Sequence, residues 1–246
     1  RANYFLPPRP GLMISESEVE ISFDAPRFGM GDANDVRAVN LQFSVEGSKF
    51  TIGETEFSIP MCGELNVRNA LAVVTVARHC GLNDKQIQDA FETFEGIKRR
   101  MEVRGEVAGI IIVDDFAHHP TAIQETLKAL RMKYPGRRLW AIFEPRSNTT
   151  RRAVFQEELG KAFNNADRVV ISAVAKLEQI PKLERLDPLK LMGALQTSGV
   201  NGVYLSDVQA IVEHLKIHAQ KGDVICVLSN GGFGGVHEEL LEALKV

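Results

Sequence analysis

The stretch IIIVDDFAHHP, residues 110–120, decides the fold of the second half of this 246-residue chain. Four consecutive apolar residues, Ile110 to Val113, predict a strand that is buried on both faces of a sheet. Two aspartates follow directly, and Pro120 suits the first turn of a helix, with His119 held extended before it. The stretch therefore predicts a strand, a polar loop and a helix, which is the repeating unit of an α/β fold.

The same alternation continues on both sides of this stretch. We expect strands at 101–107, 109–114, 138–143, 167–173, 202–205 and 223–228, and helices near 120–133, 150–164, 187–197, 207–219 and 234–244. Strands that alternate with helices predict an α/β domain with a mostly parallel, doubly wound sheet and right-handed crossovers.

The first part of the chain follows another pattern, so we place a domain boundary near residue 97, giving domains 1–96 and 97–246. Apolar and polar residues alternate over 18–59, which predicts antiparallel strands with one solvated face. The alternating sets are Val19-Ile21-Phe23, Val39-Leu41-Phe43, Phe50-Ile52 and Phe57-Ile59. A helical period then runs from Asn66 to Gly81, and Asn83 or Asp84 is expected to cap a second helix that ends near Phe94.

The composition is that of a globular protein, with 44% hydrophobic residues, 25% charged residues and a net charge of −3. No block of like charge points to nucleic acid or to an anionic membrane surface, and no apolar run approaches the ~20 residues that span a bilayer. Cys62, Cys80 and Cys226 lie far apart without metal-ligand spacing, which predicts free, buried thiols in a reducing cytoplasm. The chain begins with Arg1 rather than methionine, and we expect it to be a piece of a longer polypeptide.

Three polar loops follow predicted strands, where ligands bind in open α/β sheets. In the first loop, 114–120, an aspartate can accept hydrogen bonds from ribose hydroxyls, and an imidazole can stack on or bond to a purine. The alternative is a capped turn with two solvated carboxylates. A metal site is disfavoured, because the adjacent His118 and His119 on an extended segment point to opposite sides.

The second loop, FEPRSNTT at 143–150, places Arg146 beside a predicted helix start, which favours a carboxylate or phosphate. Its alternative reading is a set of helix caps, Ser147, Asn148 and Thr149. The third loop, SNGGFGG at 229–235, has four glycines that let backbone N–H groups turn toward an anion, although a flexible turn is the simpler interpretation. It lacks the order of a dinucleotide-binding fingerprint, so NAD is not expected.

One further pair lies in the first domain. Asn66 and Asn69 are three residues apart and therefore share one face at the start of the predicted helix. N-capping would use only one of them, and contact with a nucleotide or with the following domain would account for the other.

Together these motifs resemble those of the Mur ligases: GELNVRNA at 63–70, GIKRRME at 96–102, DDFAHHPTAI at 114–123, FEPRSNT at 143–149 and SNGGFGG at 229–235. The similarity extends from about Phe43 to Leu244. It implies that 1–96 is the tail of the family's central ATPase domain and that 97–246 is its Rossmann-like carboxyl-terminal domain. The family's GxxxxGK[ST] phosphate loop is absent from this sequence, so we expect the chain alone to be catalytically silent.

The resemblance also implies the ligands and the residues that bind them. The adenine of ATP would contact Asn66 and Asn69, and its phosphates would contact Arg100. Asp115 would bind the ribose, and His118 would lie close to the nucleotide. Arg100 would also stabilise charge during catalysis. The incoming amino acid or peptide would face Arg146, Ser147, Asn148, Ser229 and Asn230. Mg²⁺ would be held mostly by residues outside this chain, so no metal ligand is assigned here.

The reaction implied is ATP-dependent amide formation through an acyl phosphate of UDP-N-acetylmuramate. Phe116-Ala117 and Arg146-Ser147-Asn148 favour the members that add the tripeptide L-Ala-γ-D-Glu-meso-diaminopimelate during peptidoglycan recycling over those that add L-alanine. Addition of L-alanine and a role as a peptide- or nucleotide-binding module remain the alternatives. No nucleic acid or membrane partner is expected, and the sequence makes no prediction of oligomeric state.

Overall fold

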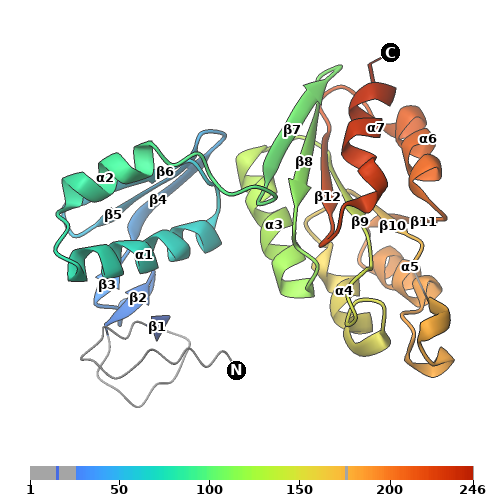
Figure 1. Cartoon of the computed structure of the whole chain (residues 1–246), viewed down its shortest axis with the longest axis horizontal. Helices are drawn as coiled ribbons and strands as arrows, with labels where there is room; N and C mark the ends of the chain where they lie inside the picture. The colour runs from blue at the N-terminus through green and yellow to red at the C-terminus, as the bar shows by residue number, and fades with distance from the viewer. Residues whose placement is uncertain (1–14, 17–25, 175–176, 246) are drawn as a thin grey trace. The chain divides into compact units, whose positions relative to one another are not determined.

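The computed structural model describes residues 15–16, 26–174 and 177–245. The chain forms two compact units, Arg1–Glu95 and Gly96–Val246, called here the first and second units (Figure 1). None of the helices in the described part of the chain is long and apolar enough to cross a membrane.

The second unit is built on a six-stranded sheet with the order β11-β10-β9-β12-β8-β7. Its strands are β7 (Glu102–Val107), β8 (Ile110–Asp115), β9 (Leu139–Phe143), β10 (Arg168–Ser172), β11 (Asn201–Leu205) and β12 (Val224–Leu228). Every neighbouring pair is parallel except β7 with β8, which are antiparallel. The predicted mostly parallel α/β sheet is confirmed.

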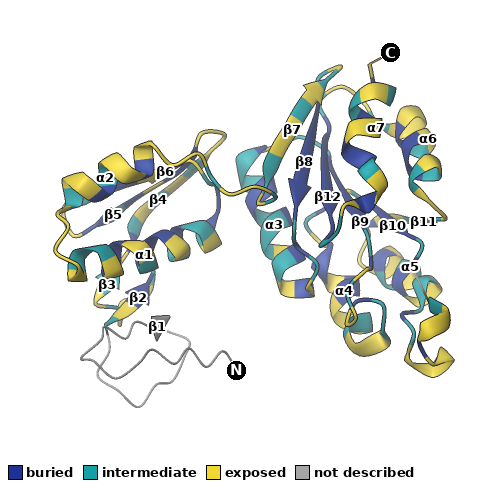
Figure 2. Cartoon of the chain, in the orientation of Figure 1, coloured by how far each residue is buried: buried dark blue, intermediate teal, exposed yellow. Residues whose placement is uncertain are grey.

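Helices cover both faces of this sheet (Figure 1). They are α3 (Pro120–Lys133), α4 (Gln156–Ala162), α5 (Pro188–Thr197), α6 (Val208–His218) and α7 (Val236–Ala243). Ile111 and Val113 of β8 pack in one apolar core with α3, α4 and α5, while Ile110 and Ile112 pack in a second core with α6 and α7. All of β8 is buried (Figure 2), as its apolar run predicts for a strand covered on both faces.

Two predicted helices begin later than expected, each for a local reason. Residues 153–155 form a 3-10 turn before α4, because Arg152 is extended and bridges to Arg185 instead of continuing a helix. The last helix starts at Val236 rather than at 234, because Gly234 and Gly235 have φ angles of 58° and 80°. Left-handed backbone of this kind cannot continue a right-handed helix.

The first unit contains an antiparallel sheet with the order β4-β5-β6 and two helices over one apolar core. Its elements are β1 (Ser15–Glu16), β2 (Arg27–Gly29), β3 (Val36–Arg37), β4 (Val39–Ser44), β5 (Gly47–Ile52), β6 (Thr55–Ile59), α1 (Glu64–His79) and α2 (Asp84–Glu92). The three alternating sets between 39 and 59 are confirmed as antiparallel strands, whereas Val19-Ile21-Phe23 lies outside the described residues. The short parallel strands β1, β2 and β3 were not predicted, because two or three residues are too few to show a period.

The expected cap of α2 is also present. The Asn83 side chain accepts from the backbone N–H of Gln86, and the Gln86 side chain accepts from the N–H of Asn83, which forms a capping box. All three cysteines are free. The expectation that they are buried is wrong for Cys80, which is exposed just after α1, where no apolar layer covers the helix end.

Candidate functional site

The carboxyl ends of β8, β12 and β9 lie side by side, and the three polar loops begin there. The register pairs Leu228 of β12 with Asp115 of β8 on one side and with Phe143 of β9 on the other. Residues 116–119, 144–150 and 229–235 therefore leave the sheet at neighbouring points. Together with the side chains that contact them or each other beside them, they form the candidate site, called here the carboxyl edge; these side chains are Arg99, Arg100, Asp114 and His237.

Arg99 ties the segment before β7 to the glycine-rich loop. Its Nη2 donates to the carbonyl oxygens of Ser229 and Gly231 at 2.6 and 2.8 Å. Its Nε lies 3.2 Å from Asp114 Oδ2, and its own N–H donates to Glu102 Oε2 at 2.7 Å. Arg99 also has a φ of 58°, which is uncommon for a residue with a side chain. Its four bonds hold it in that conformation.

Asp114 is the buried anion of this network, with only 3% of the residue exposed. The Nε2 atom of the equally buried His237, on α7, lies 3.3 Å from Asp114 Oδ1. Burial by itself raises the pKa of this carboxyl, but contact with His237 and the charge of Arg99 outweigh it, and the pKa of Asp114 lies below its ordinary value. Asp114 is therefore an ionised anchor for Arg99.

Asp115 is bonded inside the second unit. One carboxylate oxygen accepts from the N–H of Met101 at 2.8 Å, and the other accepts from the N–H of Ala117 at 2.8 Å and from the Thr126 hydroxyl at 3.2 Å. Burial raises the pKa of Asp115 despite these donors. In this arrangement the carboxylate shapes the loop, and a bond to ribose would replace one of these internal bonds.

Arg100 contrasts with its neighbour Arg99, because its side chain is exposed. Its guanidinium carbon lies 5.8 Å from the centre of the Phe116 ring, and no hydrogen bond or ion pair engages this side chain within the described residues. His118 is half-buried beside the same ring, with Nδ1 3.0 Å from the Phe116 carbonyl oxygen. Arg100, Phe116 and His118 therefore form one surface with a cation that is available to a ligand.

Glu144, Ser229 and Arg146 connect the second and third loops. The Ser229 hydroxyl donates to Glu144 Oε2, and the Glu144 Oε1 atom lies 3.7 Å from Arg146 Nη1. A Cβ on Gly231 would lie 2.6 Å from Cδ and Nε of Arg146, so only glycine lets this arginine rest on the loop. Arg146 is exposed and Ser229 is buried, which leaves the guanidinium as the accessible part of this cluster.

Two predicted contact residues have local partners. The Ser147 hydroxyl accepts from the N–H of Thr150 at 3.1 Å, and the Asn148 side chain accepts from Arg151 Nη2. Ser147 therefore closes a turn at 147–150, and the expected helix caps are absent, because the 3-10 turn and α4 begin later, after Arg152 and Phe155, without a side-chain cap. Asn230 differs, because its Oδ1 atom is buried and has no hydrogen-bond partner within the described residues. A buried acceptor without a donor is costly, and a ligand N–H would satisfy it.

Asn66 and Asn69 belong to the first unit, at the start of α1. Gly63 is the N-cap and no side chain caps this helix end, so neither asparagine plays the expected capping role. Asn66 Nδ2 donates instead to the carbonyl oxygen of Cys62 at 2.8 Å, and Asn69 is exposed.

Four members of the carboxyl edge were not predicted: Arg99, Asp114, Glu144 and His237. The pair Arg99-Arg100 signals a basic segment, but the backbone geometry decides which one turns inward. Glu144 could have been found from the sequence, because it is a charged residue two positions before Arg146. Across the described residues, no group of three or more His, Cys, Asp or Glu is arranged to hold a metal ion.

Comparison with known proteins identifies the family. The model of the Mur ligase, glutamate ligase domain matches residues 99–231, which is more than half of the chain. The Escherichia coli UDP-N-acetylmuramate–L-alanyl-γ-D-glutamyl-meso-2,6-diaminoheptandioate ligase is 36% identical over 201 residues, covering 81% of this chain and 41% of that protein. The Desulfitobacterium hafniense UDP-N-acetylmuramate–L-alanine ligase is 33% identical over 219 residues, covering 87% and 49%.

Solved structures show the same fold. A murein peptide ligase of Psychrobacter arcticus is 36% identical with a TM-score of 0.65, over 90% of this chain and 46% of that one. The UDP-N-acetylmuramate-alanine ligase of Thermotoga maritima has a TM-score of 0.76 at 20% identity, over 94% and 51%. The chain thus spans about half the length of the curated relatives it matches.

Proposed function

The chain belongs to the Mur ligase family, and we propose that it is part of an ATP-dependent ligase that joins a peptide to UDP-N-acetylmuramate by an amide bond. The observation that carries this proposal is that Arg100, Arg146 and Asn230 all belong to the carboxyl edge, Arg100 beside Phe116 and Arg146 against Gly231. Two exposed guanidinium groups and one buried, unsatisfied acceptor meet the needs of phosphate, carboxylate and amine groups respectively.

Arg146 is proposed to bind a carboxylate of the incoming peptide. Its guanidinium is exposed, rests on Gly231, and lies 3.7 Å from the half-buried Glu144. A planar guanidinium pairs with a carboxylate through two parallel hydrogen bonds. The Asn230 Oδ1 atom, buried in the adjacent loop, is proposed to accept a hydrogen bond from a peptide N–H. Both contacts would position the amine that attacks the activated carboxyl group.

Arg100 is proposed to bind phosphate oxygens of ATP. Its side chain fits that role, because it is exposed and forms no hydrogen bond or ion pair within the described residues, while Phe116 and His118 offer an aromatic surface beside it. ATP supplies the phosphoryl group that activates the substrate carboxylate. Arg100 would neutralise negative charge as that group is transferred, which is the main demand of phosphoryl transfer on a protein. Asp115, His118, Asn66 and Asn69 remain proposed nucleotide contacts.

Mg²⁺ does not fit the described residues of this chain. Asp114 and Asp115 are both buried and bonded to groups within the second unit, and no cluster of three candidate ligands is present in the described part. We therefore derive no step through the metal and propose that its ligands lie elsewhere in a longer protein.

The substrate proposed is the tripeptide L-Ala-γ-D-Glu-meso-diaminopimelate, used in the cytoplasm during peptidoglycan recycling. The Phe116-Ala117 and Arg146-Ser147-Asn148 sequences support it, as does the 36% identity to the Escherichia coli and Haemophilus influenzae ligases whose names carry this peptide. L-Alanine is the second candidate, supported by relatives at 33 and 34% identity that add it.

The test uses the full-length protein that contains this chain. ATP, Mg²⁺ and UDP-N-acetylmuramate are supplied with the tripeptide and free L-alanine in separate reactions, and products are identified by mass. A nucleotide–tripeptide product with little alanine adduct is expected. An alanine adduct alone would transfer the assignment to the second candidate, and no product from a folded, ATP-binding protein would contradict the ligase proposal.

A further inference from the structure

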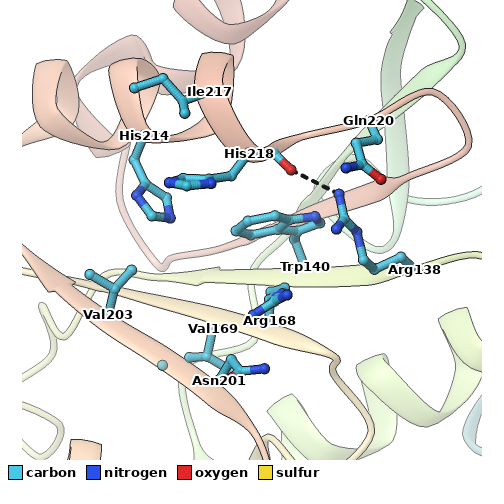
Figure 3. Close-up of a pocket in the computed structure, with 11 residues that line it drawn as sticks. Arg138, Trp140, Arg168, Val169, Asn201, Val203, His214, Ile217, His218 and Gln220 are labelled. Atoms are coloured by element: carbon cyan, nitrogen blue, oxygen red, sulfur yellow. Dashed lines mark hydrogen bonds between the residues drawn. The ribbon is translucent and has the colours of Figure 1, made fainter.

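A pocket of about 490 Å³ lies at the opposite, amino edge of the sheet in the second unit (Figure 3). It is bounded by the first residues of β9, β10 and β11 and by the end of α6. Its volume lies within the range of about 300–1,000 Å³ that is typical of small-molecule sites. The carboxyl edge lies at the other end of the sheet, after β8, β12 and β9, so this pocket is separate from the candidate site.

The charges that line this pocket are all of one sign. Arg138, Arg168, His214 and His218 contribute side chains to it, and no aspartate or glutamate is among its described lining residues. Such a lining disfavours a cationic ligand and favours an anionic one.

Arg138 is already neutralised and forms part of the floor. Its Nη2 and Nε atoms lie 2.7 and 2.9 Å from the two carboxylate oxygens of the buried Asp223. Asp223 also accepts from Trp140 Nε1 at 2.8 Å. A bidentate, buried pair of this kind fixes Arg138 and Trp140 in place and leaves little positive charge for a ligand.

Arg168 has no such partner. The neighbouring Arg131 bonds to Asp167 and to the carbonyl oxygen of Asn165, and Arg137 bonds to backbone carbonyl oxygens. The guanidinium of Arg168 has no hydrogen bond or ion pair with any described residue, although the residue is half-buried. Arg168 is therefore a cation held in a pocket without an anion.

His214 and His218 complete the cationic set. They are one helical turn apart on α6, their ring centres are 4.4 Å apart, and the two rings lie next to each other in Figure 3. Burial, followed by the charges of His218 and Arg168, lowers the pKa of His214. The geometry thus gathers two imidazoles and a guanidinium around one pocket.

We propose that this pocket binds the phosphoryl group of a small phosphorylated molecule, held by Arg168 together with His214 and His218. Donors that come from a strand and from a helix across the pocket suit a tetrahedral oxyanion better than a planar carboxylate, and the charge of Arg168 matches its negative charge. The pocket is also larger than a phosphate ion, which leaves room for the remainder of the molecule. This site does not depend on the ligase proposal, because it shares no residue with the carboxyl edge.

Trp140 gives a direct test, because it is the chain's single tryptophan and lies 6.0 Å, centre to centre, from the His214 ring. The 246-residue chain is titrated with inorganic phosphate and with glycerol phosphate while its fluorescence is recorded, and sodium chloride at equal ionic strength is the reference. A saturable change with both phosphates and none with chloride is expected. The ester is expected to bind at least as tightly as the ion. Equal responses to all three solutes, or binding of the ion alone, would overturn the proposal.

Substitutions test which residues bind the phosphate that changes the fluorescence. Arg168→Gln is expected to weaken phosphate binding about 10-fold or more, in line with the loss of a charge-assisted hydrogen bond. His218→Gln, at an exposed position, should weaken it less and provides a second variant if Arg168→Gln lowers the stability. Arg146→Gln, at the carboxyl edge, and Lys161→Gln, on the exposed surface of α4, are the controls and should bind normally. Loss of binding in Arg146→Gln but not in Arg168→Gln would overturn the assignment.

The contribution of the imidazoles is measured with sulfate, because sulfate keeps its two negative charges between pH 6 and 8, whereas phosphate changes its charge. The groups around His214 are His218 on its own helix, Arg168 on β10, and Arg138 just before β9, which is paired with Asp223 of the turn before β12. Histidine is the one residue type around this pocket that can gain a proton in this pH range. Affinity for sulfate should therefore rise as the pH falls from 8 to 6, and an affinity that is constant or falls would contradict the participation of the histidines.

Discussion

The two edges of the sheet in the second unit use arginine in the same two ways. At the carboxyl edge, Arg99 is bonded to Asp114 and to two backbone carbonyl oxygens, while the next residue, Arg100, is exposed and bonded to no anion in the described structure. At the amino edge, Arg138 is paired with Asp223, while Arg168 lines the pocket without a counter-charge. A bonded arginine holds loops together, and an unbonded one is available to a ligand.

The edges differ in the negative charge near the available cations. At the carboxyl edge, Glu144 lies beside Arg146, so both signs of charge are present, as a peptide with amine and carboxylate groups requires. At the amino edge the lining is cationic or neutral, which suits a simple anion. The same sheet can therefore present two chemically distinct sites at its two ends.

Among substitutions that compare bonded with available arginines, Arg99→Gln should lower the stability most. It removes the partner of buried Asp114 and two bonds to backbone carbonyl oxygens, and we expect a loss of about 3 kcal/mol in the free energy of unfolding. Urea unfolding of the second unit, followed by Trp140 fluorescence, measures it. Arg100→Gln is the matched control and should change stability by less than about 0.5 kcal/mol. Equal losses of stability in the two variants would contradict the distinction between bonded and available arginines.

Asp114→Asn should have a smaller effect that depends on pH. The pKa of Asp114 is lowered below 3.8 in the folded protein, so its ionised form stabilises the fold above that pH, and this contribution is lost as the pH falls through the folded-state pKa. We expect a loss of about 2 kcal/mol at pH 7. Unfolding curves of both proteins between pH 3 and 7 should converge at the acidic end, and a constant difference would argue against an ionised Asp114.

Gly231→Ala should affect stability least. The added Cβ would lie 2.6 Å from Cδ of Arg146, whose exposed side chain can move away. The urea midpoint is therefore expected to change little, by the equivalent of about 1 kcal/mol or less. In the full-length ligase, the displaced Arg146 should raise the KM for the peptide more than it lowers kcat. An unchanged KM would show that the contact between Arg146 and Gly231 does not position the peptide.

The sequence predicted the sheet closely because its four inner strands, β8, β9, β10 and β12, carry runs of consecutive apolar residues. Ile110 to Val113 and Val224 to Leu228 fall within observed strands for this reason. The delayed start of α4 was not predictable, because it depends on a bridge between Arg152 and Arg185, which are distant in sequence. Long-range pairs of this kind leave no local period.

The candidate site was only partly predictable for the same reason. The loops that carry Asp115, Arg146 and Ser229 were found from their position after strands. Their internal partners were not, since Arg99 meets the carbonyl oxygen of Gly231 across 132 positions and Ser229 meets Glu144 across 85. Residue type and loop position predict where a ligand can bind, but three-dimensional contacts decide which side chains remain available.

The most direct test of the central claim is the initial rate of tripeptide ligation by the full-length protein carrying Arg100→Gln, Arg146→Gln or Lys161→Gln. If the carboxyl edge binds the reacting groups, the first two variants should lose about 100-fold or more in kcat/KM, as when a charge-stabilising group is removed. Lys161→Gln should retain the parent rate. Full activity of a folded Arg100→Gln and Arg146→Gln enzyme would contradict the assignment of the carboxyl edge as the site of ligation.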